Sequence, residues 1–326
     1  MLKNKKLETY YVVSSRYDLN QRKIITIISE TDGNHVFEFI ASFEKIIDLE
    51  LLSLLKKVKG YSFDTKELAT LRIELASEMT QSIKSILTEN NMELNHVDCI
   101  AIENPELNTD IAVDLATHIQ QKLRIPVIFN IDLTDNSEFL KVLAENKKVE
   151  NGFIINLDEN FEIYKLNSTV SYIETSLGYS ILRYLALYLN LEQENIAYLI
   201  SQGEVDESIL NKLKSAKTLE NLQKELINSI MFSKIKTEDK LKTAFFVIKS
   251  LLLKNLAEFD KNSNIMLIGN TGMIEELNQA LKEVFENVVF LKNQSQRQYT
   301  LLNEQLAYIA AKKHVLENYN NGVKLS

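Results

Sequence analysis

GFIINLDENFEIYKLNSTVSYI, residues 152–173, lies near the middle of the chain and decides the fold, because it repeats an arrangement already present at the start. Two β-rich runs, 152–157 and 161–166, flank the turn Asp158-Glu159-Asn160, and a third short run follows at 170–173. Such alternating runs joined by turn residues predict a β-meander. The sequence therefore predicts that a second domain starts here.

The same order opens the chain. Residues 10–14, 23–29 and 35–40 are β-rich, and Thr31-Asp32-Gly33-Asn34 joins the last two runs with a strong hairpin signal. The apolar spacing of residues 43–58 predicts a helix after this meander. The first half of the chain is therefore expected to begin like the second.

Helices and strands alternate after each meander. Asp64 and Thr65 are expected to cap a long helix whose apolar residues recur every three or four positions. In the first half we then expect a strand over 97–102, a helix over 109–123 and a strand over 126–131. In the second half we expect helices over 177–189, 193–202, 207–213, 219–230 and 238–259, a strand over 264–268, a helix over 272–285, a strand over 288–291 and a helix over 301–318.

A meander followed by alternating helices and strands, present twice, predicts a duplicated α/β fold. This is the two-lobed, ribonuclease-H-like arrangement with a central cleft that actin-like ATPases and many sugar kinases share. We expect an N-terminal lobe of residues 1–125 with 300–326, closed by the C-terminal helix, and a C-terminal lobe of residues 126–299. In that plan, the first hairpin turn of each half and a glycine turn before a late helix surround the nucleotide phosphates.

Composition excludes several classes of function. The 45 acidic and 37 basic side chains give a net charge of −8, which opposes nucleic-acid binding. We expect a cytoplasmic protein, because we find neither a signal peptide nor an apolar run of the ~20 residues that a membrane span needs. Cys99 lies in an apolar run and is expected to be a buried thiol, and the four histidines lack ligand spacing. We therefore expect no metal held by protein alone.

Several stretches resemble one enzyme family in order, over almost the whole chain. The longest is Leu68–Pro105, and LRIPVI at 123–128 resembles a T-G-I-P-V-V strand that ends in a D-F-R motif. ETSLGY at 174–179 resembles a D-T-G-P-G-N turn, QGEVD at 202–206 a G-x-V segment, and residues 264–278 a strand, glycine turn and helix near adenosine. These segments resemble the anhydro-N-acetylmuramic acid kinases.

The resemblance implies an activity and its requirements. Kinases of this family use ATP with Mg²⁺ to open the 1,6-anhydro ring of an amino sugar during peptidoglycan recycling, and leave a 6-phosphate. Their dimeric habit implies a homodimer, to which the helices over 177–259 have enough apolar surface to contribute. An amino-sugar substrate or an unidentified protein partner is therefore expected.

The phosphate turns depart from the family pattern. Ser15 and Asn20 stand where the first hairpin, M-S-G-T-S-L-D-G, has glycines, and the second hairpin carries Asp158 and Glu159. Side chains compromise the close approach of phosphate to the backbone, and the carboxylates repel it. The positions that the resemblance implies for nucleotide binding are Ser15, Asn156, Asp158, Thr175, Gly178, Gly269 and Gly272.

The sugar end departs as well. Asn130 stands at the position of the family's general base, an aspartate, and an amide cannot accept the proton. Asp132 lies two residues on and is a possible substitute, and Asp135 follows. Residues 103–106, ENPE, replace the family's H-G-Q-T.

Three functions remain open from the sequence. The first is a degenerate, pseudokinase-like homologue that keeps the fold as a binding or assembly module. The second is an active sugar kinase, with Asp132 or Asp135 as base and Asp158 or Glu159 holding Mg²⁺ against the phosphates. The third is an actin-like structural protein unrelated to sugar kinases. No P-loop, nucleophile elbow, zincin or Rossmann motif points elsewhere.

Overall fold

The computed structural model divides the chain into two compact units, residues 1–147 with 300–326, and residues 148–299. The sequence predicted a boundary after residue 125, which would separate strand β5 from β4, the strand with which it pairs. None of the helices in the described part of the chain is long and apolar enough to cross a membrane. The structure describes residues 8–18, 22–60, 62–103, 109–129, 131–157, 160–191, 195–213, 216, 218–269, 274–290 and 301–320.

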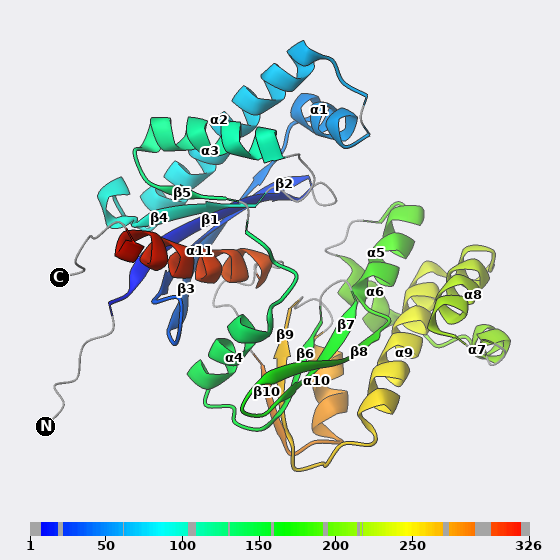
Figure 1. The fold of residues 1–326 in the computed structure, drawn as a ribbon. Helices are drawn as coiled ribbons and strands as arrows, with labels where there is room; N and C mark the ends of the chain where they lie inside the picture. Colours follow the sequence, from blue (N-terminus) through cyan, green and yellow to red (C-terminus); the bar gives the residue numbers. More distant parts are fainter. Residues whose placement is uncertain are drawn as a thin grey trace, which may run out of the picture. The chain divides into compact units, whose positions relative to one another are not determined.

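The first unit is built on a five-stranded sheet with the order β3-β2-β1-β4-β5 (Figure 1). The first three strands form an antiparallel meander, whereas β4 and β5 run parallel to β1. Its strands are β1 (Tyr10–Asp18), β2 (Lys23–Thr31), β3 (Phe37–Ile46), β4 (Cys99–Ile102) and β5 (Val127–Ile128).

Helices cover both faces of this sheet. On one face, α1, α2 and α3 bury an apolar core against the strands, and α11, drawn in red, crosses the opposite face (Figure 1). The helical elements of the unit are α1 (Leu49–Lys59), α2 (Thr65–Glu89), the 3₁₀ turn η1 (Leu94–His96), α3 (Thr109–Leu123), α4 (Ser137–Asn146) and α11 (Leu301–Asn320).

The second unit repeats the strand order of the first, as β10-β9-β6-β7-β8. A meander again supplies three strands, and two parallel strands complete the sheet, which confirms the predicted duplication. The strands are β6 (Gly152–Asn156), β7 (Phe161–Leu166), β8 (Val170–Ser176), β9 (Asn264–Ile268) and β10 (Asn287–Phe290).

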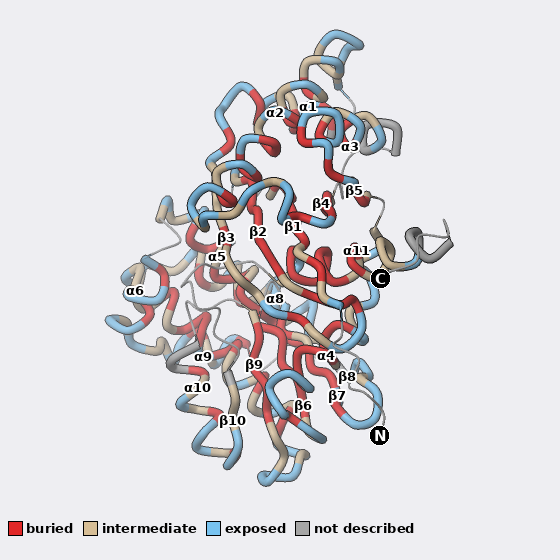
Figure 2. The backbone as a smooth tube through the Cα atoms, turned by 90° about the vertical axis from the view of Figure 1, so that its left-hand side faces the viewer, coloured by how far each residue is buried: buried red, intermediate tan, exposed pale blue. Residues whose placement is uncertain are grey.

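A larger set of helices packs against the second sheet. They enclose an apolar core with the strands, and the central strands β6 and β9 are buried along most of their length (Figure 2). The helices are α5 (Tyr179–Tyr188), α6 (Ile196–Gln202), α7 (Glu207–Leu213), α8 (Leu219–Met231), α9 (Thr237–Leu256) and α10 (Ile274–Lys282).

Capping residues determine where helices α1 and α2 begin. The sequence predicts the start of α2 correctly and places the start of α1 too early. Asp64 and Glu67 form the expected capping box at the start of α2. The predicted helix over residues 43–58 begins later, because β3 continues through Ile46 and Asp48 accepts a hydrogen bond from the Leu51 N–H at 2.7 Å. Helix α4 was not predicted.

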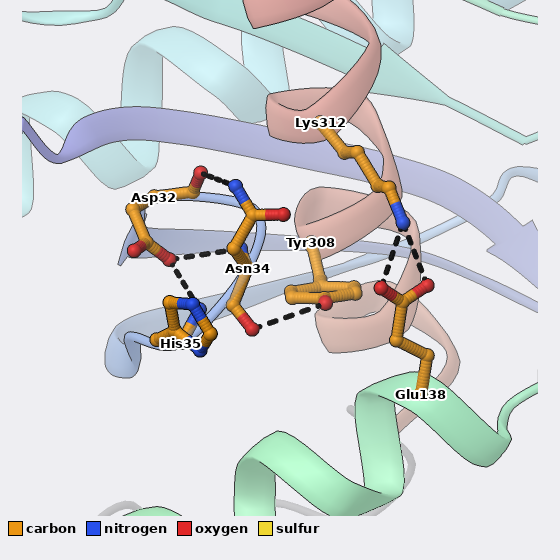
Figure 3. A network of polar contacts seen from close by, with 6 residues as sticks. All are labelled: Asp32, Asn34, His35, Glu138, Tyr308 and Lys312. Atoms are coloured by element: carbon orange, nitrogen blue, oxygen red, sulfur yellow. Dashed lines mark hydrogen bonds and ion pairs between the residues drawn. The ribbon is translucent and has the colours of Figure 1, made fainter.

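The turn between β2 and β3 is organised by one buried carboxylate. Oδ1 of Asp32 accepts hydrogen bonds from the N–H groups of Asn34 and His35, at 2.8 and 2.7 Å (Figure 3). The same oxygen accepts from the Val36 N–H at 2.8 Å. Burial raises the pKa of Asp32, but these three donors and the nearby His35 ring lower it by more, so that its pKa lies below the usual value.

Helix α11 packs against this turn and forms an ion pair with α4. A Cβ on Gly33 would lie 2.6 Å from the backbone nitrogen of Lys312, so only glycine permits this close approach. The Tyr308 hydroxyl donates to the Asn34 carbonyl at 3.5 Å, and the Lys312 ammonium lies 2.7 Å from both carboxylate oxygens of Glu138 (Figure 3). A helix from the end of the chain thus completes the first unit.

Candidate functional site

The carboxyl ends of β1 and β4 form the first candidate site, since ligands of α/β sheets bind at the carboxyl ends of strands. Ser15 pairs with Ile102, the last residue of β4, so β1 runs three residues further to Asp18. Arg16 and Asp18 lie on this extension, and Glu103 follows β4 directly. Three charged side chains therefore gather at one edge of the first sheet.

Arg16 is buried and held from two sides. Its Nε donates to Oδ1 of Asn303 on α11 at 2.7 Å, and its Nη2 lies 3.6 Å from the Asp18 carboxylate. Asn303 is itself fixed, because its Nδ2 donates to the Ile25 carbonyl at 2.9 Å and its own carbonyl accepts from Ser14 Oγ at 2.8 Å. The network holds the guanidinium in one position.

Glu103 has a different environment from Arg16. Its Oε2 is enclosed and has no hydrogen-bond partner in the described part of the chain. Burial raises the pKa of this carboxyl, Arg16 lowers it and Asp18 raises it, and the net shift is upward. A carboxyl that holds its proton more tightly than usual is suited to proton transfer near neutral pH.

Ser15 does not lie in a turn, where the sequence comparison placed it. It is a fully buried residue of β1, opposite Thr26, because β1 and β2 pair without interruption as far as Asp18 and Lys23. Its Oγ lies 3.0 Å from Thr26 Oγ1, which in turn lies 2.7 Å from Oγ of Ser82 on α2. Ser15 therefore joins the sheet to α2. Asn20 lies outside the described residues.

Asp132, the possible substitute base, is fully exposed and already engaged. Its Oδ1 accepts hydrogen bonds from the hydroxyl and the N–H of Thr134, at 2.7 and 2.9 Å. These two bonds, together with Lys313, lower the pKa of Asp132 and weaken it as a base. Asp135 similarly accepts from the Ser137 N–H at 2.9 Å. Asn130 lies outside the described residues.

The corresponding edge of the second unit carries a different polar cluster. Asn156, the last residue of β6, is buried, and its Nδ2 donates to Glu162 at 3.1 Å. The Tyr164 hydroxyl donates to the same carboxylate oxygen at 2.8 Å. Thr175, on the neighbouring strand β8, is hydrogen-bonded to the Tyr172 hydroxyl. Asp158 and Glu159 lie outside the described residues.

Two of the predicted glycines lie at this edge of the second sheet. Gly269 follows β9 with φ of +101°, a conformation that favours glycine, whereas Gly178 precedes α5 with an extended backbone. Gly272 lies outside the described residues. Within the described ranges, no group of three or more His, Cys, Asp or Glu is arranged to hold a metal ion. The nucleotide-binding roles of these residues stay predictions.

Sequence reasoning missed Arg16, Asp18 and Asn303 as site residues, and treated Glu103 only as a departure from a motif. One signal was available, because Arg16 is a charged residue that follows a run of apolar and small side chains, YYVVSS at 10–15. Asn303 had no local signal, since it lies 287 residues from its partner Arg16.

No family model matches the chain, and no curated protein matches its sequence. Component A of the (R)-2-hydroxyglutaryl-CoA dehydratase of Acidaminococcus fermentans matches with a TM-score of 0.51 and 12% identity, over 94% of this chain and 99% of that one. The activator of the 2-hydroxyisocaproyl-CoA dehydratase from Clostridium difficile, with bound ADPNP, has a TM-score of 0.49 and 10% identity, over 98% of each chain.

A ROK hexokinase from Thermus thermophilus matches with a TM-score of 0.38 and 11% identity, over 92% of this chain and 98% of that one. At such low identities the likeness establishes the fold alone. The chain has the mixed α/β, two-sheet fold of actin-like ATPases and sugar-kinase-type proteins.

Proposed function

We propose that the protein is a divergent relative of the anhydro-N-acetylmuramic acid kinases that has lost phosphoryl transfer and works as a binding or assembly module. The observation that carries this proposal is the extension of β1, which remains a paired strand through Asp18 and contains no glycine. Phosphate oxygens cannot approach the backbone of such a strand as closely as they approach a glycine turn.

The charge at this edge supports the same proposal. Phosphoryl transfer needs free cationic groups or Mg²⁺ around the phosphates. Arg16 instead donates to Asn303 and lies beside Asp18, so its charge is largely compensated within the chain. Glu103 adds a second carboxyl to the edge. The edge is better suited to a neutral, hydroxyl-rich ligand than to a polyanion.

An apolar helix face supports the assembly role. Helix α5 buries one side in the second core, yet Tyr184, Leu187 and Tyr188 on its other side are 48%, 62% and 47% exposed. Three large apolar or aromatic side chains exposed together on one helix are typical of an interaction surface, and the proposed occupant is a second copy of the chain. Sedimentation velocity should detect a dimer, and Leu187→Glu should dissociate it, whereas Ile73→Glu on α2 should not.

A second function is favoured by one observation, the enclosed carboxyl of Glu103 with its raised pKa. In this alternative the protein is an active kinase for 1,6-anhydro-N-acetylmuramic acid with ATP and Mg²⁺ as cofactors, and Glu103 rather than Asp132 takes the proton from water. Glu103→Gln should then lower kcat by about 100-fold or more while ATP affinity is unchanged. Asp132→Asn should change kcat little.

Isothermal calorimetry with ATP and Mg²⁺, with and without the anhydro sugar, separates the two functions. The binding module predicts no heat at about 1 mM ATP, the upper end of typical enzyme KM values. Micromolar ATP binding, followed by formation of a sugar phosphate that Glu103→Gln abolishes, would contradict loss of catalysis and establish the kinase.

A further inference from the structure

We draw no further inference here: the strongest candidate, the enclosed carboxyl of Glu103 together with Arg16 and Asp18 at the carboxyl ends of β1 and β4, belongs to the site already described.

Discussion

The two units share a strand order, but their buried basic residues differ in environment. In the first unit, the guanidinium of Arg16 donates to Asn303 and lies beside Asp18, all within the same sheet and its covering helix. In the second, Lys240 is buried along its stem, but its ammonium is not among the enclosed atoms that lack a partner. A guanidinium that the chain holds is structural, whereas an ammonium that reaches water needs no partner. Duplication has therefore repeated the topology and not the chemistry.

The largest expected change in stability comes from removing the Arg16 guanidinium of the first unit. Arg16→Met should lower the free energy of unfolding by about 3 kcal/mol, because Asn303 and Asp18 lose a charged partner inside the protein. Urea denaturation measures the loss. Arg124→Met removes an exposed arginine and should stay within about 0.5 kcal/mol of the wild type. A loss of less than about 1 kcal/mol in Arg16→Met would contradict a structural role for the network.

A smaller effect is expected at the turn that carries Lys240. Gly203→Ala forces a methyl group against the Glu238 carbonyl and should lower the free energy of unfolding by about 2 kcal/mol, because the first turn of α9 has to shift. The matched control is Gly60→Ala, whose methyl group would lie 3.3 Å from the Lys56 carbonyl oxygen and should cost less than about 1 kcal/mol. Equal losses of stability in the two variants would contradict the inference that Gly203 is required for close packing against Glu238.

A still smaller change is expected at Lys240. Lys240→Met should change the free energy of unfolding by no more than about 1 kcal/mol, because the buried apolar stem is kept and the ammonium that is lost is in contact with water. Urea denaturation measures the change. A destabilisation of about 3 kcal/mol, as expected for Arg16→Met, would indicate that the chain itself holds the ammonium.

The smallest effect concerns pH. The pKa of Glu103 is raised in the folded protein, so the folded state binds the proton more tightly than the unfolded state does. Stability should therefore decrease as pH rises from the unfolded pKa through the folded pKa, and the ionised carboxylate should cost stability at neutral pH. Glu103→Gln should remove this dependence and gain less than about 1 kcal/mol at pH 7. A profile that is unchanged by the substitution would contradict the raised pKa.

The sequence predicted the repeated elements because their signals are local. Strands β7 and β9 and helices α3 and α7 have the predicted bounds, since each combines a periodic apolar pattern with turn or capping residues at its ends. The extent of β1 was underestimated, because the predicted run ends at Ser14, where the polar residues Ser15 and Arg16 follow. Their polar groups are satisfied by Thr26 on β2 and by Asn303 on α11, which no local pattern records.

The candidate site was harder to predict than the fold for the same reason. The resemblance to the anhydro-N-acetylmuramic acid kinases predicted site residues in turns and at glycines. The charged side chains of the first unit instead meet through contacts between distant parts of the chain, which no local sequence pattern predicts.

The position of α11 in the chain also determines the order in which the protein is completed during synthesis. Ser14 meets Asn303 across 289 residues, which a ribosome adding about 5 to 20 residues per second needs roughly 15 to 60 s to make. Residues 148–299 are continuous and emerge within that interval, so the second unit can fold while one face of the first sheet still lacks its helix. Until the last helix arrives, the nascent chain carries an uncovered sheet that a chaperone would have to shield.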